Sequence, residues 1–108
     1  MIMVRAIVRP EKSGEVLGAL LEAGFPASTK MDVYGRGKQR GMRVGDTTYD
    51  ELPKEQILMV VDDKEKDLVV GTIMKAARTG ETGAFGDGKI FISAVEEVYT
   101  VRTGEKQT

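Results

Sequence analysis

The sequence predicts an α+β domain of the ferredoxin-like (split βαβ) type, in which a four-stranded antiparallel sheet carries two helices on one face. Two observations support this fold class. The expected elements run strand, helix, strand in each half of the chain, and a long polar stretch joins the halves. The length of 108 residues is enough for one core and not for two. We therefore expect a single domain over residues 1–108.

The first half contains two strands around a helix. Ile2–Arg9 is rich in β-branched residues and stops at Pro10, which is typical of a strand. Ser13 is expected to cap the helix that follows, and Gly24 to end it. Ala27–Tyr34 is the second expected strand. The apolar stripe of the helix is Val16, Leu17, Leu20 and Leu21. One face of the first strand carries Ile2, Val4, Ala6 and Val8, and the other carries Met3, Arg5, Ile7 and Arg9.

The two halves are joined by Gly35–Lys54, which has neither helical nor strand periodicity. Within it, Arg36–Pro53 is a connection of eighteen residues, and a structureless connection of that length is uncommon in a compact domain unless it is functional or disordered. We interpret it as an arm that contacts another molecule. The alternative is a tolerated surface insertion, because long loops cost little to close. Its charges are split, with basic Arg36, Lys38, Arg40 and Arg43 before acidic Asp46, Asp50 and Glu51.

The second half repeats the order of elements. Ile57–Val61 is an unbroken apolar run, which favours a central strand buried on both faces. Asp62 and Glu65 have the spacing of a capping box before the second helix. Thr79–Gly88 is a glycine-rich loop that leads to the last strand, Lys89–Ser93. The helix positions expected in the core are Leu68, Val69, Ile73, Met74 and Ala77.

Two helices can cover only one face of such a sheet. The other face carries alternate residues of Ile57–Val61. If that face were exposed to solvent, the small domain would have a large exposed apolar patch. A homo-oligomer that covers this face is the simplest solution. The alternative is a monomer whose tail, after a short extended piece at Val98–Val101, folds across the sheet.

Composition narrows the function classes. The chain has no cysteine and no histidine, which excludes a disulfide, a thiolate nucleophile, an imidazole base and a Ser-His-Asp triad. A metal would need oxygen ligands, which favours Mg²⁺ carried by a phosphate ligand. Sixteen basic and seventeen acidic residues give a formal charge of −1, which argues against general binding to nucleic acid or anionic membranes. Binding is therefore favoured over catalysis.

Localisation follows from two absences in the sequence. No apolar run reaches the roughly eighteen residues that a membrane span needs. The N-terminal residues lack the basic start, apolar stretch and small-residue cleavage site of a signal peptide. We expect a cytoplasmic protein with no direct membrane insertion.

Three kinds of glycine-containing segment carry basic residues and are candidates for anion binding. In Thr82–Lys89 the glycines can turn backbone amides inward as an anion nest beside Lys89, although an ordinary Asp-Gly turn is the alternative. It is no Walker loop, because the spacing differs and a strand follows. Arg-Thr-Gly-Glu occurs at residues 78–81 and again at 102–105, which points to a shared polyanion unless the repetition is chance. Gly35–Gly41 places basic residues between glycines that let backbone approach a ligand closely.

Taken in order, these segments resemble the three loops of the PII signal-transduction family, small trimeric sensors of nitrogen and carbon status. Gly35–Gly41 (GRGKQRG) resembles the start of the family's T-loop, and Leu52–Lys54 (LPK) resembles its return. Gly86–Phe91 (GDGKIF) resembles the B-loop, and Arg102–Glu105 (RTGE) the C-loop. The resemblance places the T-loop at about 36–54, the B-loop at about 79–89 and the C-loop at about 100–106.

The resemblance implies effector sites in the clefts between the subunits of a homotrimer. ATP or ADP would lie there, and ATP with 2-oxoglutarate would bind a Mg²⁺ that Gln39 also ligates. Lys54 would pair with the distal carboxylate of 2-oxoglutarate, and Arg102 would come from the neighbouring chain. The nucleotide residues would be Ile7, Gly35, Thr82, Gly86, Asp87, Gly88, Lys89 and Arg102. The 2-oxoglutarate residues would be Gln39, Lys54, Gly37, Lys38, Arg40 and Gly41, and the arm would contact a partner through Arg43, Asp46 and Tyr49.

Three departures from the family pattern bear on these roles. Members commonly carry Arg-x-Arg before Thr-Gly-Glu, and here Thr100 replaces the first arginine. Extra residues before Gly86 leave either Thr79 or Thr82 as the B-loop threonine, and the spacing favours Thr82. Tyr49 is too close to the return of the arm to align with the T-loop tyrosine that is uridylylated in enterobacteria.

Further segments resemble one branch of the family, the nif-cluster PII proteins of methanogens and related anaerobes. In that branch two PII paralogues act together on nitrogenase, and this chain resembles the first of them. The branch implies nitrogenase or another nitrogen-metabolism protein as the partner, and a hetero-oligomer with the second paralogue. The alternatives are a PII regulator of an ammonium transporter and, in another class, a small nucleotide-hydrolysing enzyme. The segments are Lys30–Val33, Gly45–Asp46, Tyr49–Glu55 and Val95–Tyr99.

Overall fold

The computed structural model describes residues 1–44 and 47–107, and for residues 37–44 and 47–50 it describes the backbone only. Within these described residues there are two α-helices and four strands, with one short 3₁₀ turn before the second helix. In chain order they are β1 (Ile2–Val8), α1 (Pro10–Glu22), β2 (Thr29–Val44), β3 (Thr47–Val61), the 3₁₀ turn (Asp63–Glu65), α2 (Lys66–Ala77) and β4 (Gly88–Ala94).

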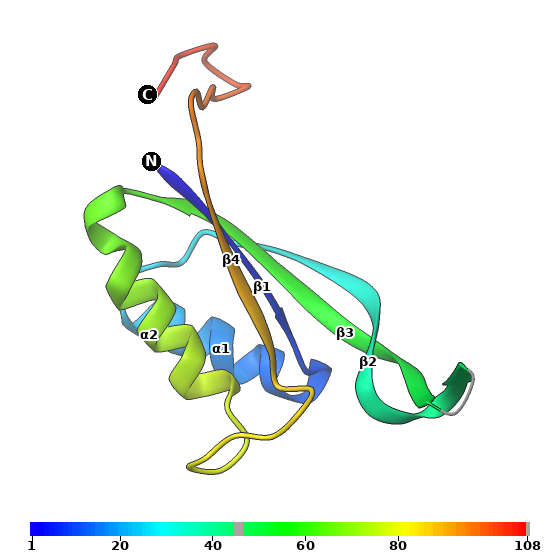
Figure 1. Ribbon diagram of the computed structural model, residues 1–108. Helices are drawn as coiled ribbons and strands as arrows, with labels where there is room; N and C mark the ends of the chain where they lie inside the picture. Colours follow the sequence, from blue (N-terminus) through cyan, green and yellow to red (C-terminus); the bar gives the residue numbers. More distant parts are fainter. Residues whose placement is uncertain (45–46, 108) are drawn as a thin grey trace.

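The four strands form one sheet in the order β2-β3-β1-β4. Every neighbouring pair is antiparallel. Both helices lie against the same face of the sheet, and the other face is uncovered (Figure 1). The predicted ferredoxin-like arrangement is therefore confirmed.

The core lies between the helices and one face of the central strands. Strand alternation produces it, because residues two apart in a strand point to the same side. Val4 pairs with Met59 and Ala6 with Ile57, so the inward residues of β1 and β3 stack on one face. The buried apolar side chains are Val4, Ala6, Val8, Val16, Leu20, Ile57, Met59, Val61, Val69, Ile73 and Ala77.

The start of α1 differs from the prediction. The helix begins at Pro10, whose fixed φ and missing N–H suit the first helical turn. Ser13 therefore lies inside the helix, where it is buried and donates a hydrogen bond to Glu55 Oε2 at 2.9 Å. The predicted cap was wrong, whereas the predicted end was right. Gly24 has a φ of +97° there, which lets the N–H of Phe25 reach the carbonyl of Leu20 at 2.8 Å.

The predicted core stripes of the helices are too wide. Leu21 is 60% exposed, Leu68 is 54% exposed and Met74 is 47% exposed in the single chain. The predicted capping box is also wrong, because Asp62 makes no side-chain capping bond. Its backbone carbonyl instead accepts the N–H of Glu65 at 3.0 Å, which closes the 3₁₀ turn before α2.

The arm is the largest correction, because it is strand and not a structureless connection. β2 continues to Val44 and β3 begins at Thr47, so the two strands extend into the predicted arm as one hairpin (Figure 1). The pairing runs to Gly37↔Asp50, shifts, and resumes at Met42↔Tyr49. A backbone ladder needs no alternation of apolar side chains, which is why the polar sequence gave no sign of it.

The uncovered face also corrects the prediction for the third strand. β3 is central, between β2 and β1, but only one of its faces is buried, and Val60 on the other face is 37% exposed. Met31 and Phe91 are likewise exposed. The tail continues past the far end of β4 (Figure 1). The expected extended piece at Val98–Val101 is reduced to one bridge, Tyr99↔Lys106.

Within residues 1–44 and 47–107, no helix combines the length and apolar character that crossing a bilayer would require.

Candidate functional site

A cavity of about 560 Å³ lies at the end of the sheet where β4 begins and the β2–β3 hairpin leaves the body. It brings together residues from four separate stretches of the chain. Most of the residues predicted to bind nucleotide line it, and Lys54, predicted for 2-oxoglutarate, lines it as well. The lining residues are Ile7, Gly35, Arg36, Lys54, Ala84, Phe85, Gly86, Asp87, Gly88 and Lys89.

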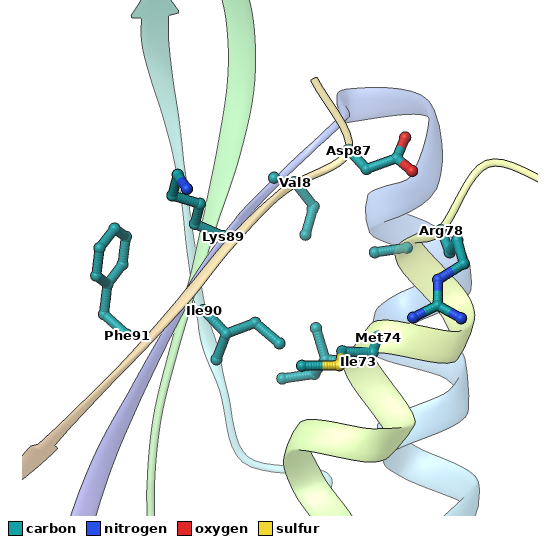
Figure 2. A pocket seen from close by; sticks show the side chains of 10 residues that line it. Val8, Ile73, Met74, Arg78, Asp87, Lys89, Ile90 and Phe91 are labelled. Atoms are coloured by element: carbon teal, nitrogen blue, oxygen red, sulfur yellow. The ribbon is translucent and has the colours of Figure 1, made fainter. Parts of the chain in front are cut away.

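Strand register explains why these residues meet. Ile7 pairs with Lys89 across β1 and β4, so both side chains lie on the face away from the helices. Figure 2 shows Lys89 and Phe91 on one side of β4, and Ile90 on the other side, toward Ile73 of α2. The sheet therefore separates the cavity from the apolar core.

Gly88 lies close to the backbone of β1. It pairs with Val8 and has a φ of +119°, which L side chains rarely adopt. A Cβ built there would lie 1.8 Å from the backbone oxygen of Ile7. Only glycine fits at this position, and the loop turns into the strand here.

Asp87 organises the loop that precedes β4. Its carboxylate accepts hydrogen bonds from the N–H of Thr79 at 3.0 Å and the hydroxyl of Thr79 at 2.6 Å. It also accepts the N–H of Ala84 at 2.8 Å and Arg9 Nε at 3.0 Å. Burial by itself would raise the pKa of Asp87, but the hydrogen bonds from Thr79, Ala84 and Arg9 outweigh it and hold the pKa well below its ordinary value.

Lys54 joins the end of the predicted arm to this loop. Its side chain is buried, with the residue 8% exposed, and Nζ donates to the carbonyl of Gly86 at 2.7 Å. Burial lowers the pKa of Lys54 and repulsion from Arg9 lowers it further, against the attraction of Glu11 and Asp87. Within the described residues the ammonium donates one hydrogen bond, which leaves two of its three N–H groups to bind an anion in the cavity.

Two predicted nucleotide residues do not line the cavity. Thr82 lines a separate depression formed by its own loop. Arg102 belongs to the tail, which lies beyond the far end of β4 (Figure 1). Within one chain, Arg102 therefore cannot join the other residues.

Sequence reasoning missed Arg9. The guanidinium donates to Asp87 and, through Nη2, to the carbonyl of Phe85 at 2.7 Å. The sequence showed only an arginine as the last residue of the first expected strand, and its partners are more than seventy positions away. Arg36 was predicted only as one of the basic residues of the arm, and it lines the cavity as well.

Several predicted residues belong to the part of the hairpin without described side chains. The backbone of most of them follows β2 and β3, and their predicted contacts with ligand or partner fall outside the described residues. Asp46 lies outside the described residues altogether. The predicted site residues for which only the backbone is described are Gly37, Lys38, Gln39, Arg40, Gly41, Arg43 and Tyr49. Among the described side chains, no group of three or more carboxylates converges to hold a metal ion.

A second cavity, of about 390 Å³, lies on the helix side of β4. Figure 2 shows Val8, Ile73 and Ile90 pointing into it, with Arg78 at the end of α2 beside it. It shares residues 87–89 with the first cavity but lies across the strand from it.

Sequence comparison assigns the family. The family described as "Nitrogen regulatory protein P-II" matches residues 1–105, which is nearly the whole chain. The chain belongs to the PII family. Proteins of this family are regulators in signal transduction, and the prediction from the three loop motifs is confirmed.

Named relatives of the PII chain come from nitrogen-fixation gene regions of methanogens. "Nitrogen fixation nifHD region GlnB-like protein 1" of Methanothermobacter marburgensis is 58% identical over 98% of both chains. "Nitrogen fixation nifHD1 region GlnB-like protein 1" of Methanosarcina barkeri is 50% identical over 97% of both chains. The predicted branch, the first nif-cluster paralogue, is confirmed, and the protein is assigned to nitrogen regulation.

A solved structure agrees with the fold. The crystal structure of Arabidopsis thaliana PII bound to citrate is similar, with a TM-score of 0.77 and 37% sequence identity. The match covers 97% of this chain and 83% of the plant chain.

Proposed function

We propose that this PII protein senses nitrogen and carbon status by binding ATP or ADP and 2-oxoglutarate in the 560 Å³ cavity, and that it passes the signal on through the hairpin arm. The observation that carries the proposal is the convergence of Lys54 and Lys89 with the glycine turn 86–88 at the base of the hairpin. Two ammonium groups and a glycine-rich turn suit an anion such as a polyphosphate.

The cavity would bind the phosphates of the nucleotide with one set of residues and the base with another. The phosphates would lie against the backbone amides of Gly86 and Gly88 and against the ammonium of Lys89. The Asp87 N–H, predicted to join them, is already donated to the carbonyl of Ala84 at 3.2 Å. Ile7 and Gly35 line the same cavity and offer apolar contact and close backbone approach for the base. The described residues therefore fit a nucleotide.

A neighbouring subunit would complete the site. The tail that carries Arg102 continues past the end of β4 that is far from the cavity, so a phosphate contact from Arg102 would require a second copy of the chain (Figure 1). The exposed apolar side chains of the uncovered sheet face, among them Met31, Val60 and Phe91, support burial against other copies. We propose a homotrimer with one site in each cleft.

The second effector would bind beside the nucleotide. 2-Oxoglutarate would pair its distal carboxylate with the two unused N–H groups of Lys54, next to the arm backbone at 37–41. The plant PII of similar structure is bound to citrate, another polycarboxylate. Mg²⁺ would be held by the nucleotide, 2-oxoglutarate and Gln39, and it would supply charge that links the two anions.

The target would be nitrogenase or another protein of nitrogen metabolism. The relatives' positions in nitrogen-fixation gene regions support this partner. A relative named "Nitrogen regulatory protein P-II 2", from Methanothermobacter thermautotrophicus, is 51% identical over 93% of this chain, which supports a second PII protein as the other subunit of a hetero-oligomer.

The test is titration calorimetry with ATP. Lys89→Ala removes a charge-assisted contact worth roughly 1.5–3 kcal/mol, so the affinity should fall by about tenfold or more. Lys75→Ala is the matched control, because Lys75 is an exposed lysine of α2 away from this cavity. Equal ATP affinity in wild type and Lys89→Ala would overturn the assignment of the cavity.

A further inference from the structure

The loop before β4 is closed by hydrogen bonds that need no ligand. Asp87 accepts bonds from both ends of the loop, from Thr79 at its start and from Ala84 near its end. Backbone bonds reinforce the closure, from Gly83 N to Thr79 O at 3.0 Å and from Asp87 N to Ala84 O at 3.2 Å. The turn is therefore already folded around one carboxylate.

Arg9 braces the same turn from outside. One guanidinium nitrogen, Nε, binds Asp87, and another, Nη2, binds the carbonyl of Phe85. Arg9 lies directly between β1 and α1, two elements anchored in the core. The brace therefore ties the loop to the rigid body of the domain.

The carboxylate of Asp87 and the ammonium of Lys89 lie on different sides of β4. Figure 2 shows the carboxylate on the α2 side of the strand, while Lys89 points to the other side. Four donors surround its two oxygens, so its negative charge is compensated before an anion arrives. The hydrogen bonds that lower the pKa of Asp87 keep it ionised at neutral pH.

We propose that Asp87 is a positioning residue, which with Arg9 and Thr79 holds the turn 83–88 in its phosphate-receiving conformation before any ligand binds. The inference rests on the proposed nucleotide function. A turn that is ordered in advance loses less conformational freedom on binding, and the saving appears as affinity. The backbone N–H of Asp87 is already donated to the carbonyl of Ala84, so Asp87 acts on the site through the bonds of its side chain with Arg9, Thr79 and Ala84.

The same geometry separates the two candidate threonines. The hydroxyl proton of Thr79 is engaged by Asp87 Oδ1 at 2.6 Å, so Thr79 serves the loop and is not a donor to nucleotide. Thr82 Oγ1 makes no hydrogen bond within the described residues, but Thr82 lines the depression of its own loop and not the 560 Å³ cavity.

Amide hydrogen exchange of the ligand-free protein, followed residue by residue by NMR, tests the positioning role. We expect the Ala84 N–H to be protected in wild type and to exchange faster in Asp87→Asn and in Thr79→Val. Thr79→Ser keeps the hydroxyl and should restore the wild-type rate. Glu81→Gln removes a carboxylate from the same loop without touching Asp87 and is the matched control. Amides of β1 should keep their wild-type rates in Thr79→Val, since the change is local.

The second measurement is ATP affinity in the same variants. Asp87→Asn and Thr79→Val should each weaken ATP binding by about tenfold, and Thr79→Ser and Glu81→Gln should not. The positioning role is overturned if the Ala84 N–H exchanges equally fast in wild type and Asp87→Asn. It is also overturned if exchange accelerates while ATP affinity stays unchanged. Failure of the proposed function is distinguishable, because wild type would then bind no ATP whatever the exchange rates, and the positioning role would fall with it.

Discussion

Replacing Gly88 by alanine tests the close approach of this glycine to the backbone of β1. The new Cβ would lie 1.8 Å from the carbonyl oxygen of Ile7, whereas real Cβ contacts essentially never fall below 3.0 Å. β4 and β1 must therefore separate locally by roughly 1.2 Å, the difference between those two distances. The backbone cannot relieve the clash by rotation alone, because the φ of +119° is itself unfavourable for an L side chain.

The expected loss of stability combines two effects. The strained backbone conformation costs about 1–3 kcal/mol. Separation of the strands at Val8↔Gly88 disrupts one or two backbone hydrogen bonds, each worth about 1 kcal/mol. We expect a loss of about 3 kcal/mol in the free energy of unfolding, a factor of roughly 100 in the folding equilibrium.

Urea denaturation followed by circular dichroism, at one fixed protein concentration, measures this loss. With a slope of about 2 kcal/mol per molar urea, the midpoint should fall by about 1.5 M. Gly71→Ala is the matched control, because Gly71 is in α2 and a Cβ there has no atom within 4 Å. That change should stabilise by about 0.5–1 kcal/mol. Equal midpoints for wild type and Gly88→Ala would refute the close approach.

Two further predictions concern charge and assembly. The pKa of Asp87 is lower in the folded chain than its ordinary 3.8, so its contribution to stability is complete above that value and is lost as pH falls below it. The stability difference between wild type and Asp87→Asn should therefore be constant near neutral pH and shrink below pH 3.8, and a constant difference down to strong acid would contradict the bonding around Asp87. Light scattering at micromolar concentration should give a trimer, and a monomer would contradict burial of the uncovered sheet face.

Element order and the cavity residues could be predicted because they depend on local signals. The strand Ile2–Val8 and the inward positions of α2 follow from side-chain periodicity. Gly86–Lys89 and Lys54 follow from motif resemblance, and the fold places them together. Both side-chain periodicity and motif resemblance can be recognised in the sequence without knowing which distant residues come into contact.

The wrong and missed predictions for single side chains have a common physical cause, because contacts with distant parts of the chain decide where these side chains lie. Ser13 has the chemistry of a helix cap, but Pro10 starts the helix earlier and Glu55 takes the hydroxyl. Arg9 finds its partners in a loop far along the chain. Leu21 is apolar and at helical spacing, yet no element of the single chain covers it.

The structure of the arm was predicted wrongly for a different reason. Its residues are polar and rich in glycine, so no side-chain pattern marked the strands that run to Val44 and from Thr47. The pairing there is made by backbone groups. It keeps the register of the sheet as far as Gly37↔Asp50 and resumes in a shifted register at Met42↔Tyr49. A hairpin can extend from a well-formed sheet wherever nothing in the sequence interrupts the ladder.

The most direct test of the account is the response of the arm to effectors. Lys54 ends the arm and donates to the carbonyl of Gly86, so a ligand that binds the two unused N–H groups of Lys54 would constrain the base of the hairpin. By linkage, 2-oxoglutarate with Mg-ATP should shift the arm among conformations, and ADP alone should not. The arm contains arginine and lysine residues, so limited digestion with trypsin reports on it.

We expect trypsin to cleave wild type at different rates with Mg-ATP plus 2-oxoglutarate and with ADP, and Lys54→Ala to lose that difference. Lys75→Ala should keep it, since Lys75 is exposed on α2. Equal cleavage rates of wild type in the two effector states would contradict the central claim that the cavity controls the arm.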